Sequence, residues 1–456
     1  MASIVERGRV AGEQGGVCCG DADRRQRRQE ESSPHRTNQG DPGRGRETDS
    51  SVFSRVGKDL ARLAQWKVSR PGDVKADVWI ADGRKKNAVP YPLLGQDCGG
   101  RTQLLNYSRG SACLTLKSSM VRTLLAHHAA TGAGSAEGNA GNADSASGAG
   151  SAGSAFPAYL PETFIVYPAA GEADLERRRR ELRVDERAAF LLAAAAHADG
   201  GGVWIAKGSA GMGGNGIEIG RDAKTLLQGI DACGKDTAWV VCRYIDRPFL
   251  LAGRKFDIRA WALLAPNYTS YLFEEGVART SSFEYDLSDL SDRKKHLTNH
   301  CIQCEAPEYS KFEAGNELSF QQVHEYLQTQ NPPADFHLHV LPQIKHIIRE
   351  ALKAGKAKLE PLPDSVLQPF QVFGFDFLLD QDLKVWLLEI NGSPASRELL
   401  LPDMSLGIIT TAILPSFASD PRAPPQGEWA AGIEAIRQER GGVVGPGGAP
   451  VNFVPL

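Results

Sequence analysis

Hydrophobic and polar positions along the chain follow two patterns, one typical of helices and one typical of short strands. Apolar residues recur at helical spacing in some stretches, whereas others are short runs rich in Val, Ile, Phe and Trp. Helices are predicted at residues 56–66, 118–128, 181–197, 320–329 and 341–353, and strands at residues 78–80, 203–206, 238–244, 256–264, 370–379 and 384–390. This mixture predicts an α/β (α+β) fold.

Three stretches follow neither pattern. Residues 1–50 have few apolar positions, so they cannot offset the entropy cost of ordering and are predicted to be a disordered tail. Residues 131–155 are nearly all Gly, Ala, Ser and Asn, the composition of a flexible insertion, and residues 419–456 are expected to be a Pro/Gly-rich tail. Between the two tails, an N-terminal α/β domain is expected at 51–117, a central domain that contains the insertion at 118–245 and a C-terminal domain at 246–418.

Composition and charge narrow the classes of function. The 456 residues are 41% hydrophobic and 23% charged, so the chain is not wholly disordered. Lys plus Arg total 52 against 55 Asp plus Glu, a formal net charge of -3. No global field therefore draws the protein onto DNA or an anionic membrane, and neither nucleic acid nor a membrane is expected as a partner.

The cysteines and the most apolar run, which is too short for a membrane span, predict a cytoplasmic protein. Eight scattered cysteines in a chain of this length do not make a small disulfide framework, which favours a reducing compartment. The apolar run at residues 188–198 is about half of the ~20 residues needed to span a bilayer, and its alanines favour a helix. The N-terminus lacks the apolar segment of a secretory signal.

A glycine-rich loop follows the predicted strand at 203–206. Gly211, Gly213 and Gly216 match the Gly-x-Gly-x-x-Gly spacing of dinucleotide sites, but that motif must open a helix, and the residues after Gly216 read as a strand. The arrangement favours a hairpin flap whose amides approach phosphate oxygens, with Lys207 supplying a charge. The alternative is an ordinary flexible hairpin.

Charged residues alternate along the start of the predicted strand at 256–264. The period of two places Lys255, Asp257 and Arg259 on one face. Such a row can line a cleft and neutralise phosphate oxygens, or it can be a solvated face with a ladder of ion pairs.

The last two predicted strands form an antiparallel hairpin that carries acids among apolar residues. Asp376 and Glu389 are expected on one face, about two residues apart diagonally, with Asn391 continuing the row of Glu389. Ionised carboxylates in an apolar setting need a partner, and three oxygen ligands suit Mg²⁺ bound to ATP phosphates. The alternative is acids at strand ends that face water.

The run HLTNHCIQC at residues 296–304 carries two His and two Cys, which invites a zinc interpretation. Zinc sites use two well-spaced ligand pairs, and this cluster has no second pair, so a loop whose Thr298 and Asn299 side chains hydrogen-bond elsewhere is favoured.

Five motifs, in this order along the chain, resemble those of the tubulin-tyrosine ligase family of ATP-grasp ligases. They are WIAKGSAGMGGNGI, RKFDIRAW, EGVARTSS, HLTNHCIQ and FGFDFLLDQDLKVWLLEINGSPA, with further similarity in LLNYSRG and LPETFIVYP. The similarity covers residues 51–417 and implies an ATP-grasp fold with a smaller N-terminal α/β domain. The HCIQ ending is similar to the tyrosine-adding branch of the family rather than to its glutamylating and glycylating members.

The resemblance implies a set of site residues. It implies that Lys207 and Lys255 contact ATP phosphates, that Gly214, Asn215, Gly216 and Ile217 form the flap, and that Cys242, Arg243, Tyr244 and Ile245 form the hinge facing adenine. It implies Asp376, Glu389 and Asn391 as Mg²⁺ ligands, and catalytic Arg259, Arg279 and Asp257, with Thr298 and Asn299, around the γ-phosphate and the reacting carboxylate. K⁺ is a further candidate cofactor.

The activity implied by the resemblance is ATP-dependent ligation of free tyrosine to the terminal glutamate of detyrosinated α-tubulin, through an acyl phosphate. The resemblance also implies a monomer in the cytoplasm that binds the αβ-tubulin dimer and associates with the cytoskeleton. The alternatives are a glutamate or glycine ligase of the same family and a catalytically inactive tubulin-binding module.

Several positions depart from the family pattern. The hinge has Cys242 and Arg243 where the family usually has Gln-Lys, Gly213 replaces a Lys of the flap, and the last motif reads GSPAS rather than GAPA. These departures bear on adenine affinity and flap dynamics rather than on the reaction class. The basic face that meets tubulin in the family is matched loosely, by Arg84, Lys85, Lys86, Arg109 and Lys117.

Overall fold

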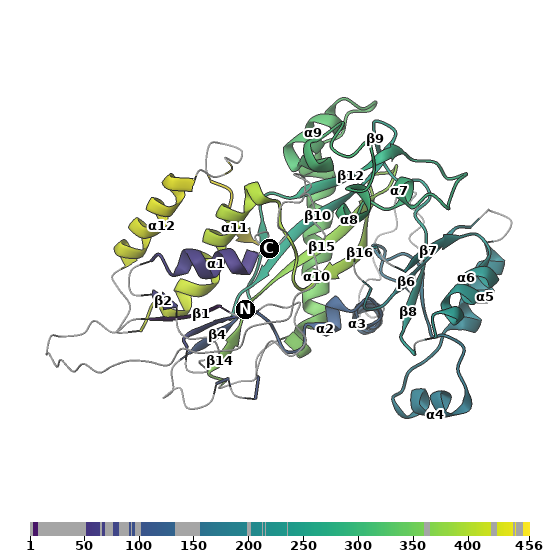
Figure 1. The fold of residues 1–456 in the computed structure, drawn as a ribbon, viewed down its shortest axis with the longest axis horizontal. Coiled ribbons are helices and arrows are strands. Elements are labelled where there is room, and N and C mark those ends of the chain that lie inside the picture. The colour runs from purple at the N-terminus through teal and green to yellow at the C-terminus, as the bar shows by residue number, and fades with distance from the viewer. Residues whose placement is uncertain are drawn as a thin grey trace, which may run out of the picture.

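Mixed sheets and helices make up the computed structural model (Figure 1). It describes residues 3–7, 52–63, 66–68, 76–81, 91–92, 94–95, 102–132, 156–197, 202–211, 213–214, 216–234, 236–359, 365–420, 426–440, 443 and 450–456. The helices are α1 (Val52–Leu60), α2 (Ala112–Thr115), α3 (Lys117–Gly132), α4 (Glu172–Arg180), α5 (Arg187–Ala196), α6 (Ala223–Ala232), α7 (Arg293–His296), α8 (His300–Gln303), α9 (Phe320–Gln328), α10 (Leu341–Leu359), α11 (Leu401–Ile408) and α12 (Gln426–Arg440). Shorter turns are η3 (Ala314–Asn316), η4 (Phe336–Val340), η5 (Glu398–Leu400), η6 (Ile409–Ile413) and η7 (Leu414–Phe417).

The largest sheet has eight strands and is built around β10. The order β13-β12-β10-β11-β17 is extended by β15, which pairs with β10 and β16, and by β9, which pairs with β10. Its strands are β9 (Leu250–Leu251), β10 (Arg254–Leu264), β11 (Ser270–Phe273), β12 (Val277–Glu284), β13 (Glu317–Ser319), β15 (Gln371–Leu379), β16 (Val385–Asn391) and β17 (Phe453–Pro455).

Every residue of β10 is buried, because both faces of the strand are covered. Ile258 and Ala260 lie in the core that includes Ile347 of α10 and the Phe side chains of β15. The odd-numbered residues of β10 point to the other face. On this face the first half of the strand carries the charged row, and Trp261 and Leu263 in the second half lie in a second core with α1 and α11. One strand thus joins the main core to a polar site.

A four-stranded sheet, order β5-β8-β6-β7, precedes the large sheet in the chain. Phe164, Trp204 and Trp239 pack against Phe190 of α5 and Ile230 of α6, which cover one face of this sheet. The strands are β5 (Thr163–Val166), β6 (Trp204–Gly208), β7 (Ile217–Gly220) and β8 (Trp239–Arg243). The antiparallel pair of β6 and β7 confirms that a strand, and not a helix, follows the glycine loop.

The N-terminal sheet draws strands from distant parts of the chain. Its order is β14-β4-β3-β1-β2, and its strands are β1 (Ser3–Arg7), β2 (Trp66–Val68), β3 (Val78–Ile80), β4 (Gln103–Leu105) and β14 (Leu367–Pro369). Residues 3–7, expected to belong to a disordered tail, instead pair with β2 and β3 as a strand. The rest of residues 1–50 and residues 133–155 of the expected insertion lie outside the described residues, whereas 131–132 end α3.

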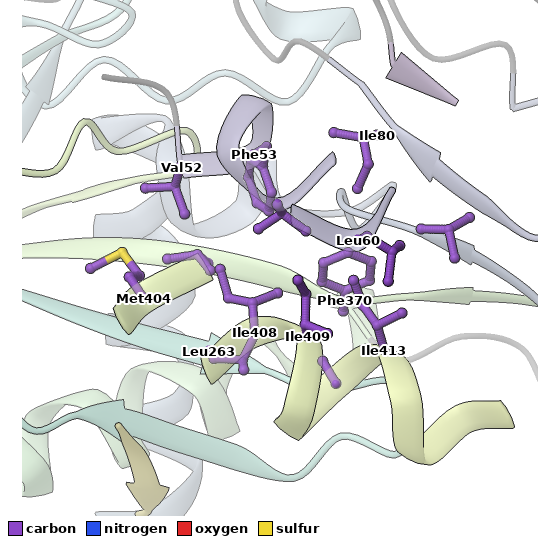
Figure 2. Close-up of a cluster of buried hydrophobic side chains, with 14 of the residues drawn as sticks. Val52, Phe53, Leu60, Ile80, Leu263, Phe370, Met404, Ile408, Ile409 and Ile413 are labelled. Carbon is purple, nitrogen blue, oxygen red and sulfur yellow. The ribbon is translucent and has the colours of Figure 1, made fainter. Parts of the chain in front are cut away.

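Apolar side chains of α1 and α11 pack over β10 and β15 (Figure 2). Phe53 and Leu60 of α1 meet Leu263, Phe370 and the apolar residues of α11 and η6 in this core. The stretch Glu398–Phe417 is the one part of the described chain that is long and apolar enough to cross a bilayer, a run that the sequence analysis overlooked. Because 67% of its most apolar window is buried inside the protein, we interpret it as a core helix.

Residues 426–440 form α12 and residues 453–455 form β17, which corrects the prediction of a Pro/Gly-rich tail for these parts of residues 419–456. Helix α12 buries Trp429, Ile433 and Ile436 in the core with α1 and α11, and β17 adds a strand beside β11. The apolar positions 429, 433 and 436 lie at helical spacing, so a signal for α12 was present among the Gly and Pro residues.

Ile436→Val is therefore expected to lower the free energy of unfolding by about 1 kcal/mol, since Ile436 is only 3% exposed and loses a buried methyl group. Val184→Ala, at a side chain that is 64% exposed, removes apolar atoms from a solvated position and serves as the control. Denaturant titration measures both. Equal effects of the two substitutions would contradict the packing of α12.

Most predicted elements recur with shifted boundaries. The helix expected at 56–66 is Val52–Leu60 and the one expected at 341–353 extends to Leu359. The helix expected at 181–197 begins only at Arg187, since Leu182 adopts a positive φ of 52° that interrupts it. The α/β prediction is confirmed.

Candidate active site

A cavity lies between the four-stranded sheet and the large sheet, where most predicted site residues meet. Those that line it are Lys207, Gly214, Ile217, Cys242, Arg243, Tyr244, Ile245, Lys255, Asp257, Arg279, Thr298, Asn299, Asp376 and Glu389. Arg259 and Asn391 touch this lining through Asp376, and Gly216 directly precedes Ile217 in the flap. Asn215 lies outside the described residues.

The flap between β6 and β7 depends on glycine. Gly213, Gly214 and Gly216 have φ values of 65°, 77° and 66°, a backbone conformation that residues with a Cβ atom rarely adopt. A Cβ atom on Gly214 would lie 2.4 Å from Cδ1 of Ile302 in α8, so a side chain there would have to displace that methyl group. Arg293 donates to the carbonyl of Gly214, which ties the flap to α7.

The three charged residues of β10 share one face, as predicted, and all are buried. The exposed fractions of Lys255, Asp257 and Arg259 are 7%, 4% and 8%, which excludes the alternative of a solvated outer face. Burial and the nearby Lys207 lower the pKa of Lys255 to about 7, against an opposing effect of Asp257. Lys255 therefore loses its charge near neutral pH unless an anion binds beside it.

Two arginines share two carboxylates on this face. Nε of Arg279 donates to Oδ1 of Asp257 at 3.0 Å, and the Arg279 guanidinium lies 3.0 Å from Oδ2 of Asp376, which also accepts from Arg259 at 2.9 Å. Burial acts to raise the pKa of Asp376, but the two guanidinium groups outweigh it and hold this pKa well below its usual range. Asp376 is thus a carboxylate, the form that a cation requires.

Asp376, Glu389 and Asn391 converge on the hairpin of β15 and β16. Asp376 pairs directly opposite Glu389, not diagonally as predicted, because a bulge shifts the register between Asp376 and Phe377. Nδ2 of Asn391 lies 3.3 Å from Oδ2 of Asp376 and 3.4 Å from Oε1 of Glu389, so Oδ1 is its remaining ligand atom. Two carboxylates and an amide oxygen that lie this close together are oxygen ligands that fit Mg²⁺.

Lys117 is a site residue that the sequence analysis placed elsewhere. It was assigned to a basic outer face, yet its Nζ lies 2.9 Å from Oε2 of Glu389 and donates to the carbonyl of Gly211 at 2.8 Å. Arg109 lies over the ring of Tyr91 at 5.1 Å. Residues 84–86 lie outside the described residues, and of the two other predicted members of the basic face Lys117 lines the cavity instead.

The zinc alternative for residues 296–304 finds no support. Among the residues that the structure describes, no group of three or more His, Cys, Asp or Glu side chains is arranged to hold a metal ion. His296 is buried and hydrogen-bonded to Tyr244 and to the carbonyl of Asp289, and the Gln303 side chain bonds the backbone of Ser282, Lys294 and Leu297. The segment runs from the end of α7 through α8, and within the described chain its buried hydrogen-bonded side chains are His296 and Gln303 rather than the predicted Thr298 and Asn299.

The predicted hinge continues from the end of β8. Cys242 pairs with Thr163 of β5 and Ile205 of β6, and burial raises the pKa of its thiol, so it stays protonated at neutral pH. Tyr244 and Ile245 follow along the cavity wall. The hinge thus offers a mostly apolar surface on which a planar base can lie.

Affinity for ATP is expected to fall as the pH rises from about 7 to about 8.5. Free Lys255 has a pKa of about 7, and a bound phosphate favours its charged form, so binding takes up a proton in this range. The maximum slope is about tenfold per pH unit, and Lys255→Met should bind more weakly with a flatter profile. Titration with labelled ATP measures this, and parallel profiles for the two proteins would contradict the assignment of Lys255.

Comparisons with known proteins agree with this geometry. The model of the tubulin-tyrosine ligase family matches residues 102–421. The chain is 29% identical to tubulin glycylase 3B of Tetrahymena thermophila, covering 42% of this chain and 16% of that protein. It is 33% identical to the probable tubulin polyglutamylase TTLL9 of Bos taurus (34% and 33% covered) and 33% identical to the protein polyglycylase TTLL10 of Macaca fascicularis (48% and 37% covered).

These comparisons confirm the family and favour a different branch of it. The chain spans less than two fifths of the length of these three relatives. Their names describe glycylases and polyglutamylases, so they favour the glutamate or glycine alternative over the tyrosine-adding branch suggested by the HCIQ motif. The family has an ATP-grasp-like fold and its members generally use ATP and Mg²⁺, consistent with the two-sheet cavity. The family model matches more than half of the chain, and the protein belongs to the tubulin-tyrosine ligase family.

Proposed function

We propose that this protein is an ATP-dependent ligase that joins glycine or glutamate to tubulin. The observation that carries the proposal is the cavity between two sheets, lined by Lys207 and Lys255 together with Asp376 and Glu389, which Asn391 contacts. Lysine cations beside oxygen donors for a metal ion suit a nucleoside triphosphate with bound Mg²⁺. The relatives supply the substrate class, since their names describe glycylation and glutamylation, two of them of tubulin.

The proposed chemistry makes an amide from a carboxylate and an amine. An oxygen of the acceptor carboxylate attacks the γ-phosphorus of ATP and ADP leaves, which gives an acyl phosphate. The amine of the donor amino acid then attacks the acyl carbon, phosphate leaves, and the nitrogen loses a proton. Lys207, Lys255 and Arg279 line the cavity in which the oxyanions of both steps are stabilised. Mg²⁺, held by the acid cluster, would supply further charge neutralisation.

The proposed setting is a monomer in the cytoplasm, close to microtubules. A ligase that modifies internal glutamate side chains does not require a free α-tubulin terminus. The proposal therefore predicts activity on tyrosinated and on detyrosinated tubulin alike.

The test is incubation of the purified chain with tubulin, Mg²⁺, ATP and one of glycine, glutamate or tyrosine, followed by mass spectrometry of the tubulin. Addition of glycine or glutamate supports the proposal. Addition of tyrosine alone, and only to detyrosinated tubulin, would restore the tyrosine interpretation of the HCIQ motif. ATP binding without any incorporation would instead support an inactive tubulin-binding module.

A further inference from the structure

A chain of buried hydrogen bonds ends at Lys255. Nζ of Lys255 donates to the hydroxyl of Tyr244 at 2.7 Å, and this hydroxyl lies 2.9 Å from Nδ1 of His296. Nε2 of His296 lies 2.8 Å from the carbonyl oxygen of Asp289. Lys255, Tyr244 and His296 are 7%, 4% and 1% exposed, so water does not readily replace any of these partners.

The partners determine where each proton lies. A carbonyl oxygen accepts only, so Nε2 of His296 must carry the ring proton that bonds Asp289. In a neutral ring Nδ1 is then an acceptor, and we assign the Tyr244 hydroxyl proton to it. The Tyr285 hydroxyl also contacts the Tyr244 hydroxyl, and it donates its own proton to the carbonyl of Asp246. The oxygen lone pairs of Tyr244 are left to face Lys255, whose ammonium group is the donor.

The surrounding rings hold this geometry. The ring of His296 packs edge-on against Tyr244 and Tyr285, with ring centres 5.9 Å and 5.5 Å apart. Nζ of Lys255 lies 4.3 Å from the centre of the Tyr244 ring, within the range of a cation–π contact. His296 thus connects the loop that precedes α7 with the hinge residue Tyr244 and with β10.

We propose that His296 is a positioning residue for the nucleotide: it orients the Tyr244 hydroxyl so that a lone pair holds the Lys255 ammonium at the cavity wall. Two N–H donors of Lys255 then remain for phosphate oxygens. The inference rests on the proposed function, because it takes the cavity to be a nucleotide site. A histidine that only filled space at the end of α7 would not affect Lys255 through Tyr244.

Two substitutions distinguish the roles of the two ring nitrogens of His296. His296→Asn keeps an acceptor close to the position of Nδ1 but does not reach Asp289. His296→Gln keeps a donor close to Nε2 and removes the acceptor that orients Tyr244. We expect His296→Gln to weaken binding of labelled ATP with Mg²⁺ about tenfold and His296→Asn to weaken it less, about threefold.

The decisive measurement is a double-mutant cycle with Tyr244→Phe, which removes the connecting hydroxyl. If His296 acts through that hydroxyl, His296→Gln adds little to the loss already caused by Tyr244→Phe. Tyr326→Phe is the matched control, because it likewise removes one tyrosine hydroxyl with its hydrogen bonds, here to the backbone of Ala252 and Leu250. Tyr326 does not line the cavity. It should leave the dissociation constant unchanged within about twofold.

Additive effects of His296→Gln and Tyr244→Phe on the dissociation constant would overturn the inference, as would equal losses for His296→Asn and His296→Gln. Thermal melting identifies any variant that fails to fold, and Tyr244→Phe with His296→Asn still test the connection if His296→Gln is lost. A wild-type protein that binds no labelled ATP would overturn the proposed function itself. Wild-type binding with an additive cycle would overturn only the role of His296.

Discussion

Glu389→Gln is expected to reduce ligation at least about 100-fold, close to 2.7 kcal/mol of transition-state stabilisation, while the protein stays folded. Glu389 lies opposite Asp376, and its carboxylate is the contact of Lys117 at 2.9 Å. Glutamine has almost the same size, so packing is preserved. The change removes one of two anionic ligands for Mg²⁺ and thereby weakens the clamp on the ATP phosphates.

Mass spectrometry of modified tubulin measures the rate, and thermal melting shows whether Glu389→Gln is folded. Glu428→Gln, an exposed position on α12, makes the same chemical change outside the cavity and should retain full activity. If Glu389→Gln retained more than about a tenth of the wild-type rate, a cost of only ~1.4 kcal/mol, the assignment of the metal ligands would be wrong.

Arg279→Ala is expected to lower the free energy of unfolding by about 3–5 kcal/mol and to reduce ligation at least about 100-fold. Arg279 contacts both Asp257 and Asp376, and burial leaves these carboxylates little water in place of the guanidinium. Within the described chain Asp257 makes its ion pair with Arg279 and with no other residue. Truncation therefore leaves a buried charge without its partner.

Arg279→Ala should lower the turnover rate far more than the affinity for ATP. Arg279 is expected to face the charge that develops on the acyl phosphate rather than the adenine ring. Denaturant titration measures stability, and assays below the melting temperature separate unfolding from lost chemistry. Arg180→Ala, at an exposed position on α4, is the control for loss of a guanidinium. Normal turnover by Arg279→Ala would remove Arg279 from the catalytic set.

The strands that build the cavity were predictable from local pattern. The run at 256–264 reads as a strand from its Phe, Ile, Trp and Leu residues, and the structure starts this strand two residues earlier, at Arg254. The period of two then places Lys255, Asp257 and Arg259 together, which the burial of all three supports. These predictions succeed because both depend on neighbours in the sequence alone.

Two elements whose apolar pattern is short or interrupted, α12 and β1, were not predicted. Helix α12 carries apolar positions at 429, 433 and 436, but they stand between Pro- and Gly-rich runs that favour a tail. Its order comes from packing against α1 and α11, about 370 and 30 residues away in the chain. Likewise, β1 becomes a strand through pairing with β2 and β3, since its five residues have no partner nearby in the sequence.

Local pattern predicts which residue types the site contains, because the acids, cations and glycines recur at short spacings within single strands and one loop. How these residues pair depends on the fold. The bulge that sets Asp376 against Glu389, the contact of Lys117 with Glu389 and the chain from His296 to Lys255 join residues far apart in the sequence. Such contacts depend on register and on the packing of sheets, and no local pattern encodes either.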